Sequence, residues 1–578
     1  MPKSLIIVES PAKARTLQRY LGKNFEVKAS VGHIRDLPVN RLGVDIQNNF
    51  DPQYVTIRGK TKIINELKNA AQKADEIYLA PDPDREGEAI AWHIAETLRR
   101  SKKPVHRVLF HELTKKAILA AIEKASELNR NLFEAQQARR ILDRLVGYQL
   151  SPLLWDKVRR GLSAGRVQSV AVRMICDRER EIEAFVPEEY WTIGVRLQGE
   201  TPPPFVAQLD RVESRKAKIS NETEANELSA ALKQATYTVA KVEKKGIDIG
   251  EEGPTGLITY MRTDSTRLSD EAIAGVRHYI KRVNGPEFLP SKPNLYKTSK
   301  AAQDAHEAIR PTDSERTPEK MAPYLEKDLL ALYELIWKRF VASQMTPAIY
   351  DQSTILIEAG SFRLKATGSI LRFLGFMALY VESEDETAAD QEGEEKTLPP
   401  VQAGDRLDLH AVLPKQHFTQ PPPRYTEATL VKALEENGVG RPSTYASILS
   451  TIQEKEYVRQ MKRRFEPTDL GRLVTVLLVE HFPRVMDVDF TASMEERLDK
   501  VEEGDIKWRK LLKDFYGPFQ ESLEQAKQEM KSVKRSAEPT EIRCPLCGGT
   551  MMIKWGRKGE FLACENYPKC KHTQDFKR

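Results

Sequence analysis

The sequence feature that most constrains the fold is a strand–loop–helix pattern that occurs twice near the start of the chain. Leu5–Val8 is an unbroken apolar run, and Ala12–Leu21 after it has helical periodicity. Glu76–Ala80 is a second strand candidate, and the helical stretch Glu88–Arg100 follows it. Strands that alternate with helices form parallel sheets covered by helices. We therefore expect an α/β domain over roughly the first 120 residues.

The rest of the chain predicts further domains of other kinds. Its 578 residues allow about three to five domains at about 100–200 residues each. Residues 112–185 have long helical patterns, residues 190–245 contain strand-like stretches, and a new helical unit begins near Thr426. The acidic run 382–396 is too charged to pack and is expected to form a solvated loop.

Nothing in the sequence predicts a membrane partner or export. No run of about 18 apolar residues occurs, and Leu5–Val8 is too short for the apolar part of a secretion signal. We therefore expect a cytoplasmic protein.

Acidic side chains follow both strand candidates. Asp82, Asp84 and Glu86 come directly after the second one, and Glu9 ends the first, with Lys13 close by. Residues two apart in extended backbone project to the same side, and the carboxyl ends of parallel strands share one edge. Crowded carboxylates repel unless a cation joins them, and hard oxygen ligands suit Mg²⁺. The alternative is a polar turn that caps a helix.

Tyr260 is a candidate nucleophile. It follows an apolar run, and Arg262 lies two residues further on. A phenol with a pKa near ~10 is a weak nucleophile unless its anion is stabilised, and a guanidinium can stabilise both a phenolate and a phosphate. On spacing alone, a surface tyrosine beside an arginine is the commoner alternative.

Four cysteines at the end of the chain predict a metal site. Cys544, Cys547, Cys564 and Cys570 lie in one short window, whereas Cys176 is isolated in a helical stretch. Without an export signal, such spacing indicates a tetrahedral Zn²⁺ site rather than disulfides. The alternative is four unligated thiols.

The same tail is basic. Residues 531–578 carry 11 Lys/Arg against 5 Asp/Glu, which accounts for the whole formal charge of +6. Trp555, Phe561 and Tyr567 lie among these cations, and aromatic rings among cations suit single-stranded DNA. Two alternatives stay open: the rings form the small core of the ribbon, and the charge belongs to an ordinary solvated tail.

Longer motifs add a family resemblance. In order, they are Ser4–Lys13, Asp82–Glu86, Gly161–Ser169, Gly256–Ser265, Ala302–Pro311 and Gly438–Ser447. Together they resemble the bacterial type IA DNA topoisomerases (the DNA topoisomerase I, or omega-protein, family). Met261 after the tyrosine, the Arg441-Pro442-Ser443 run and the cysteine module are similar to topoisomerase I rather than topoisomerase III.

The resemblance implies roles for individual residues. Tyr260 attacks a DNA backbone phosphate and Arg262 binds that phosphate. Lys13 stabilises the transition state or assists the 3′-oxygen leaving group, and His306 contacts the scissile region. The resemblance implies that four acids bind Mg²⁺ or act in proton transfer: Glu9, which is also implied as catalytic, Asp82, Asp84 and Glu86. The implied single-strand path contains His33, Arg139, Arg140, Asp143, Tyr148, Trp155, Ser163, Ala164, Gly165, Arg166, Val167, Gln168, Arg262, Arg441 and Arg459. For His33 and Asp143, a structural role is the commoner alternative when each is taken alone.

The resemblance also implies the architecture: a multidomain chain of α/β, α and β parts, with a Toprim parallel-sheet domain, a toroidal core and a C-terminal zinc ribbon. The expected divisions are 1–120 (Toprim domain), 121–190 (helical DNA-binding part), 191–255 (β-rich arch or hinge), 256–380 (tyrosine domain), 381–425 (acidic loop and return strands), 426–530 (helical core), 531–543 (linker) and 544–578 (zinc ribbon).

The implied function is relaxation of negatively supercoiled DNA through cleavage of one strand, strand passage and religation, by a monomer associated with the nucleoid. A reaction that keeps the phosphodiester energy in a phosphotyrosine needs no ATP, and no Gly-x-x-x-x-Gly-Lys-Ser/Thr loop occurs. The alternatives are a Toprim-type nuclease or primase, which would not need Tyr260, and a non-catalytic protein that binds single-stranded DNA.

The resemblance breaks at one place. At Lys245–Gly246, relatives have a Pro-rich stretch and a helix that find no counterpart here. The missing segment is about 30–40 residues, longer than a short connection.

Overall fold

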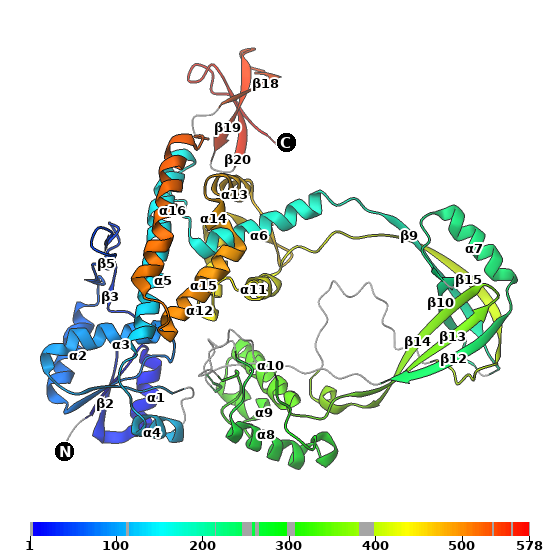
Figure 1. Ribbon diagram of the computed structural model, residues 1–578, viewed down its shortest axis with the longest axis horizontal. Coiled ribbons are helices and arrows are strands. Elements are labelled where there is room, and N and C mark those ends of the chain that lie inside the picture. Colours follow the sequence, from blue (N-terminus) through cyan, green and yellow to red (C-terminus); the bar gives the residue numbers. More distant parts are fainter. Residues whose placement is uncertain are drawn as a thin grey trace. The chain divides into compact units, whose positions relative to one another are not determined.

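The computed structural model describes residues 4–110, 115–200, 202–213, 215–245, 257–259, 265–296, 307–380, 398–533, 537–556 and 559–576 (Figure 1). The chain forms two compact units. Unit 1 contains Met1–Glu183 and Arg424–Arg578, and unit 2 contains Ala184–Pro423. In the described part of the chain, no helix is long and apolar enough to cross a membrane. The expected acidic loop at 382–396 lies outside the described residues.

Unit 1 begins with the predicted parallel sheet. Its strand order is β2 (Phe25–Ala29), β1 (Ser4–Val8), β7 (Glu76–Leu79) and β8 (Val105–Arg107). All three pairings are parallel. The α/β prediction is therefore confirmed.

Helices cover both faces of this sheet, because alternate residues of each strand point to opposite faces. On one face, α2 (Thr61–Lys73) and α3 (Arg85–Leu98) pack their apolar residues against Leu5 and Ile7. On the other face, α1 (Pro11–Leu21) and α4 (Lys115–Glu123) contribute to the cluster around Ile6 and Val8. Two short strand pairs complete this part: β3 (Arg35–Asp36) with β6 (Val55–Thr56), and β4 (Val44–Asp45) with β5 (Asp51–Pro52).

The helical part of unit 1 is built from two distant stretches of the chain, which share one hydrophobic core. The first stretch supplies two long helices, α5 (Arg130–Lys157) and α6 (Arg166–Glu183). The second supplies α11 (Glu427–Glu436), α12 (Pro442–Glu454), the hairpin β16 (Val458–Met461) and β17 (Arg464–Pro467), α13 (Asp469–His481), α14 (Pro483–Met486), α15 (Val488–Glu503) and α16 (Trp508–Glu529). Thr426 caps α11 through its side chain, as expected for a helical unit that begins there.

The end of unit 1 is a small antiparallel sheet. Its strands in order are β18 (Glu538–Arg543), β19 (Thr550–Gly556), β20 (Gly559–Cys564) and β21 (Thr573–Asp575). Strand β18 lies within the segment 531–543 that the sequence suggested as a linker, so part of that segment belongs to the ribbon sheet.

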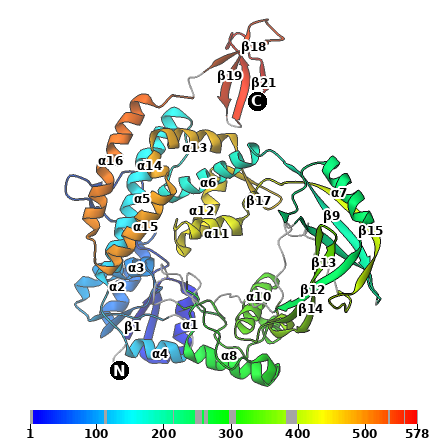
Figure 2. The ribbon, with the colours of Figure 1, turned by 45° about the vertical axis from the view of Figure 1, so that its right-hand side comes forward.

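Unit 2 contains a large antiparallel sheet and a group of helices (Figure 2). The sheet order is β11 (Arg215–Lys216), β10 (Phe205–Val212), β14 (Phe362–Phe373), β13 (Ile349–Ala359), β12 (Tyr237–Lys245), β15 (Arg406–Phe418) and β9 (Glu189–Gln198). Because β9 also pairs with β10, the sheet closes on itself. Helix α7 (Glu222–Gln234) packs its apolar residues into the same core.

A second core in unit 2 is helical. It joins α8 (Asp270–Val283) to α10 (Lys327–Ser343), with the short α9 (Pro318–Met321) beside them. Ile258 also lies in this core, two residues before Tyr260.

The core of unit 1 contains a buried charge. The Glu495 side chain on α15 is fully buried, and its Oε1 accepts a hydrogen bond of 2.5 Å from Nη2 of the equally buried Arg166. Nη1 of Arg139 lies 3.5 Å from the other carboxylate oxygen. Burial by itself would raise the pKa of Glu495, but Arg139, Arg166 and Arg441 outweigh it and lower the pKa to about 2. The carboxylate therefore stays ionised inside the protein.

We predict that Glu495→Gln lowers the free energy of unfolding at neutral pH by about 3–5 kcal/mol, because it leaves two guanidiniums without their counter-charge. The pKa of Glu495 falls from 4.5 unfolded to about 2 folded. The wild type therefore holds this stabilisation above about pH 4.5 and loses it as the pH falls toward 2. Urea unfolding across this pH range should show a slope in the wild type that the variant lacks.

The exposed neighbour Glu496 on the same helix provides the matched control. Glu496→Gln should change the free energy of unfolding by less than about 0.5 kcal/mol. Equal effects of the two variants would contradict the assignment of Glu495 as an essential counter-charge.

Candidate functional site

The two strand ends that carry the predicted carboxylates are neighbours. Glu9 follows β1 and Asp82 lies in the loop after β7, and these strands pair in parallel with Ile7 opposite Leu79. Lys13, in the first turn of α1, lies between the two acids. Its Nζ is 2.5 Å from Oε1 of Glu9 and also forms an ion pair with Asp82. The structure therefore brings Glu9, Lys13 and Asp82 together at the carboxyl edge of the sheet.

The charges of this cluster are strongly coupled. Burial is the largest influence on Asp82 and raises its pKa, Lys13 opposes that effect, and the nearby Glu9 and Asp84 add to it. Burial would lower the pKa of Lys13, but Asp82 and Glu9 outweigh it, so the pKa is raised. Oε2 of Glu9 is buried and has no hydrogen-bond partner among the described residues. A carboxylate oxygen left in this state fits a site that takes a hard cation such as Mg²⁺.

Asp84 and Glu86 differ from the sequence expectation. An extended backbone through residues 82–86 was expected, but that is wrong because α3 begins at Arg85. Asp84 is the N-cap of this helix and its Oδ1 accepts from the amide of Gly87 at 2.7 Å. Oε1 of Glu86 lies 3.6 Å from Nε2 of His33. Asp84 thus caps a helix through one carboxylate oxygen, and the acids belong to two different backbone conformations, extended at Asp84 and helical at Glu86.

Two features hold the Asp82 loop against α3. A Cβ added at Gly87 would lie 2.1 Å from the Asp82 carbonyl oxygen, so only glycine permits this approach. Arg107, whose side chain is 2% exposed, donates to the carbonyls of Pro81 and Asp82 at 2.9 and 2.7 Å and forms an ion pair of 2.7 Å with buried Glu88. Sequence reasoning missed Arg107 and Glu88, since nothing local marks a strand-ending arginine as buried.

Tyr260, Arg262 and His306 lie outside the described residues. Residues next to Tyr260 and close after His306 in the sequence are described, and they form hydrogen bonds with each other. The hydroxyl of Thr259, which precedes Tyr260, donates to the Ala308 carbonyl at 2.7 Å and accepts from the Arg310 amide at 3.0 Å. The backbone amide of Thr259 donates to the Arg310 carbonyl at 2.9 Å. The segments that carry the predicted nucleophile and the predicted histidine are therefore hydrogen-bonded neighbours within unit 2.

The residues predicted along a DNA path differ in exposure. Arg140, Trp155 and Arg459 are exposed, and the half-buried ones are His33, Asp143, Tyr148, Ser163, Gly165, Gln168 and Arg441. The buried ones are Arg139, Ala164, Arg166 and Val167. Both buried arginines pair with Glu495. The structure thus places Arg139 and Arg166 in the interior, where their charge balances a carboxylate, rather than on a surface open to DNA.

Side chains form hydrogen bonds with the backbone of the loop before α6. The hydroxyl of Tyr457 donates to the Ser163 carbonyl at 2.7 Å and accepts from the Ser163 amide at 3.0 Å. Gln168 donates to the same carbonyl at 3.1 Å, and Nε1 of Trp155 donates to the Leu162 carbonyl at 2.6 Å. The sequence did not mark Tyr457 as part of this region.

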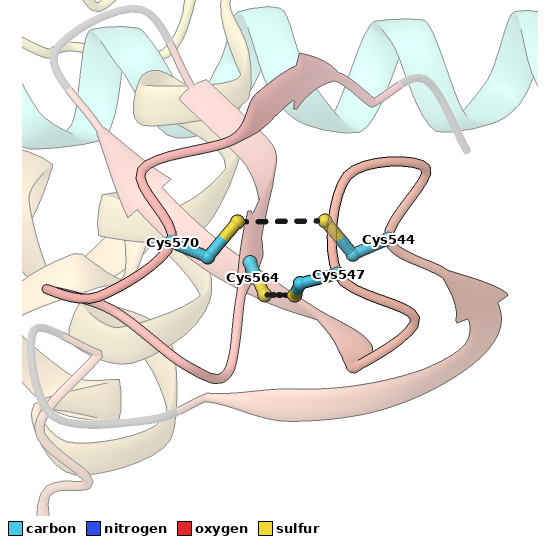
Figure 3. Close-up of side chains that lie close together, drawn as sticks. All are labelled: Cys544, Cys547, Cys564 and Cys570. Atoms are coloured by element: carbon cyan, nitrogen blue, oxygen red, sulfur yellow. Dashed lines mark hydrogen bonds between the residues drawn. The ribbon is translucent and has the colours of Figure 1, made fainter.

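The four cysteines converge on one point (Figure 3). All four Sγ atoms lie within 4.8 Å of one another. The Cys544–Cys570 and Cys547–Cys564 Sγ distances are 3.7 and 3.3 Å. A tetrahedral Zn²⁺ with Zn–S bonds of about 2.3 Å requires sulfur separations of about 3.8 Å. Among the described residues, these cysteines are the one group of three or more His, Cys, Asp or Glu side chains close enough together to bind a metal. The four acids predicted to bind Mg²⁺ do not converge as a group in this way. The ribbon sequence therefore folds into one structural zinc site.

The aromatic residues of this ribbon differ in exposure. Tyr567 is 64% exposed. Trp555 and Phe561 are half-buried. The ribbon core is made instead by Cys544, Met551, Leu562 and Cys564. Tyr567 is thus the ring most available to an external partner.

We predict that the purified chain carries one zinc ion and that Cys547→Ser lowers this content and unfolds the ribbon, since about 10–16 kcal/mol of zinc binding is coupled to folding in such modules. Metal analysis and amide hydrogen exchange over 537–576 test this. Cys176→Ser is the control, because Cys176 is buried against Thr475 away from the cluster. Full amide protection of the ribbon after chelation would contradict the prediction.

Comparisons with known proteins agree with this geometry. A family described as DNA topoisomerase matches residues 127–253 and 251–513. A Toprim domain matches residues 4–113, and a topoisomerase DNA-binding C4 zinc finger matches residues 541–578. The two stretches of the first match overlap at residues 251–253. This overlap is close to Gly246, where the sequence motifs depart from the family pattern.

A solved structure is similar over nearly the whole chain. Full-length topoisomerase I from Thermotoga maritima is 34% identical and superposes with a TM-score of 0.81. The alignment covers 99% of this chain and 97% of that one. With the family match over more than half of the chain, these comparisons show that the chain belongs to the bacterial type IA DNA topoisomerase I family.

Proposed function

We propose that this topoisomerase relaxes negatively supercoiled DNA without ATP, by cutting one strand, passing another and resealing the cut through a 5′-phosphotyrosyl link to Tyr260. Family membership makes the chain a type IA DNA topoisomerase with DNA as its substrate. The observation that carries the finer proposal is the Glu9–Lys13–Asp82 cluster at the edge of the Toprim sheet. It supplies coupled acid and base groups of the kind that phosphate transfer needs.

The proposed reaction exchanges one phosphodiester for another. The Tyr260 oxygen forms a bond to a backbone phosphorus and loses its proton, while the bond from phosphorus to the 3′ oxygen breaks. The 5′ phosphate stays on the tyrosine and the 3′ oxygen leaves as a hydroxyl. Resealing reverses both changes, so no ATP is required. Arg262 neutralises the attacked phosphate.

Lys13 is proposed to protonate the leaving 3′ oxygen. Its ammonium is held between two carboxylates that raise its pKa despite burial, so it stays protonated until the leaving alkoxide, a much stronger base than the lysine amine, takes the proton. Bound Mg²⁺, the cofactor of Toprim domains, supplies positive charge for the phosphodiester. Glu9, Asp82, Asp84 and Glu86 are its proposed ligands, and His306 is proposed to contact the scissile region.

DNA contacts are proposed mainly for the accessible residues of the predicted path. Arg140, Trp155 and Arg459 are exposed, and cations with aromatic rings suit a single strand. Arg139 and Arg166 are proposed to affect DNA binding indirectly. Both pair with Glu495 and so hold α15 in position. We propose that the enzyme acts as a monomer on single-stranded segments of the nucleoid DNA. The domain divisions given from the sequence stay proposals.

We predict that Tyr260→Phe abolishes covalent capture of single-stranded DNA, because phenylalanine has no oxygen to bond to phosphorus. Labelled oligonucleotide is incubated with and without Mg²⁺, the reaction is denatured, and the attached residue is mapped. Tyr324→Phe is the control, since Tyr324 is an exposed tyrosine of the same unit. Continued cleavage by Tyr260→Phe would favour a nuclease. DNA binding by a wild type that captures nothing would favour a non-catalytic protein.

We further predict that Lys13→Ala slows single-turnover cleavage by about 10²–10⁴-fold, the usual contribution of a positioned acid. Lys28→Ala provides the control, because Lys28 on the neighbouring strand β2 pairs with the partly exposed carboxylate of Glu26, 3.3 Å away. A cleavage rate within twofold of wild type for Lys13→Ala would refute the proposed proton donation.

A further inference from the structure

Helix α15 presents three carboxylates on one face. Glu495, Asp499 and Glu502 are spaced four and three residues apart, which places them on the same side of a helix. Glu495 pairs with Arg139 and Arg166 in the core. Further along the helix, Asp499 and Glu502 both pair with Arg85. An acidic face packed inside a protein is stable only when each charge finds a partner.

Arg85 occupies both of these carboxylates at once. Its Nη2 donates to Oδ1 of Asp499 and its Nε donates to Oε2 of Glu502. The Arg85 side chain is only 9% exposed. The other oxygen of Asp499 accepts from Nη2 of Arg441 at 2.5 Å. The guanidinium of Arg85 is thus fixed at two nitrogens, a geometry that the single nitrogen of a lysine cannot reproduce.

The contacts of Arg85 bear on the predicted Mg²⁺ ligands because of its position in the sequence. It is the first residue of α3 and lies between Asp84 and Glu86. Asp84 caps the helix through the Gly87 amide, and Glu86 faces His33. Anchoring Arg85 fixes the first turn of α3, and with it the backbone that carries both acids. The anchor comes from residues more than 400 positions away, since Asp499 is 414 residues from Arg85.

We propose that Arg85 is a positioning residue for the magnesium site, which Asp499 and Glu502 of α15 clamp so that Asp84 and Glu86 are held in place. The inference rests on the proposed assignment of these two acids as Mg²⁺ ligands. Residues behind a metal ligand set its orientation, and their loss typically costs about 10–100-fold in metal affinity. Helix α15 would then contribute to metal binding although it supplies no ligand.

The test compares two variants that weaken the clamp in different ways. Arg85→Lys keeps the charge and removes the forked contact, and Glu502→Gln removes one carboxylate and leaves Arg85 in place. Arg497→Lys is the matched control, because Arg497 also lies on α15 but pairs at the surface with Asp514 at 2.6 Å. Mn²⁺ binding to the full chain without DNA is measured by electron paramagnetic resonance. The Mg²⁺ concentration for half-maximal DNA capture and the thermal midpoint are measured in parallel.

We expect Arg85→Lys and Glu502→Gln to weaken Mn²⁺ binding and to raise the Mg²⁺ requirement by about tenfold or more. Excess Mg²⁺ should restore capture, which would not happen if the variants merely damaged the fold. Arg497→Lys should match wild type in all three measurements.

Wild-type Mn²⁺ binding by Arg85→Lys would overturn the inference. If Arg85→Lys does not fold, Glu502→Gln decides, and unchanged Mn²⁺ binding by that variant would overturn it equally. A wild-type chain that binds no Mn²⁺ would instead overturn the metal assignment in the proposed function, so the two failures are distinguishable.

Discussion

The pairing of charges that packing removes from water is the constraint on which unit 1 depends. Moving an ion the size of a carboxylate from water to a medium of low dielectric constant costs on the order of 20 kcal/mol before relaxation. Glu495 and Arg166 are both fully buried, and each is tolerated because opposite charges surround it, Arg139 also facing Glu495 and Asp143 also facing Arg166. Glu88 and Arg107 meet the same condition beside the parallel sheet. The first pair joins helices from distant parts of the chain, and the second joins α3 to the strand β8.

At the carboxyl edge of the Toprim sheet, the buried charges are only partly paired. Lys13 satisfies one oxygen of Glu9 and one of Asp82, whereas Oε2 of Glu9 is left buried without a partner among the described residues. The Glu495 cluster also leaves buried atoms without a hydrogen bond among the described residues, Oε2 of Glu495 and Nε of Arg166 among them, but each of these two atoms lies 3.5 Å from an opposite charge. A carboxylate oxygen that accepts no hydrogen bond can bind a cation or accept a proton from a substrate.

Local patterns were sufficient to predict the parallel sheet, the zinc cluster and the start of α11, because each depends on residues close together in sequence. Apolar runs marked β1 and β7, cysteine spacing marked the ribbon, and Thr426 marked a helix cap. The meeting of Glu9 with Asp82 followed from the rule that parallel strands share a carboxyl edge. The expectation failed at Glu86, because α3 begins at Arg85, whereas Asp84 keeps extended backbone as the N-cap.

Contacts across long sequence separations were not predictable in this way. Arg166 resembled a DNA-binding residue by its motif, and only the packing of α6 against α15 shows that its partner is Glu495. Arg107 and Arg85 carry no local sign of burial, since an arginine on a strand end or a helix start is usually solvated. Their partners are set by tertiary packing, which periodicity and spacing do not encode.

The way the chain enters and leaves unit 2 has a consequence for how the protein is made. It enters along β9 and leaves along β15, and these strands pair with each other, with Glu189 opposite Phe418. The two ends of the unit are therefore adjacent, as in a domain inserted into a host. Such a unit can fold during synthesis on the ribosome, before the second part of unit 1 has been made. Helices α5 and α6 gain the partners that bury their apolar faces only after residue 424 has emerged.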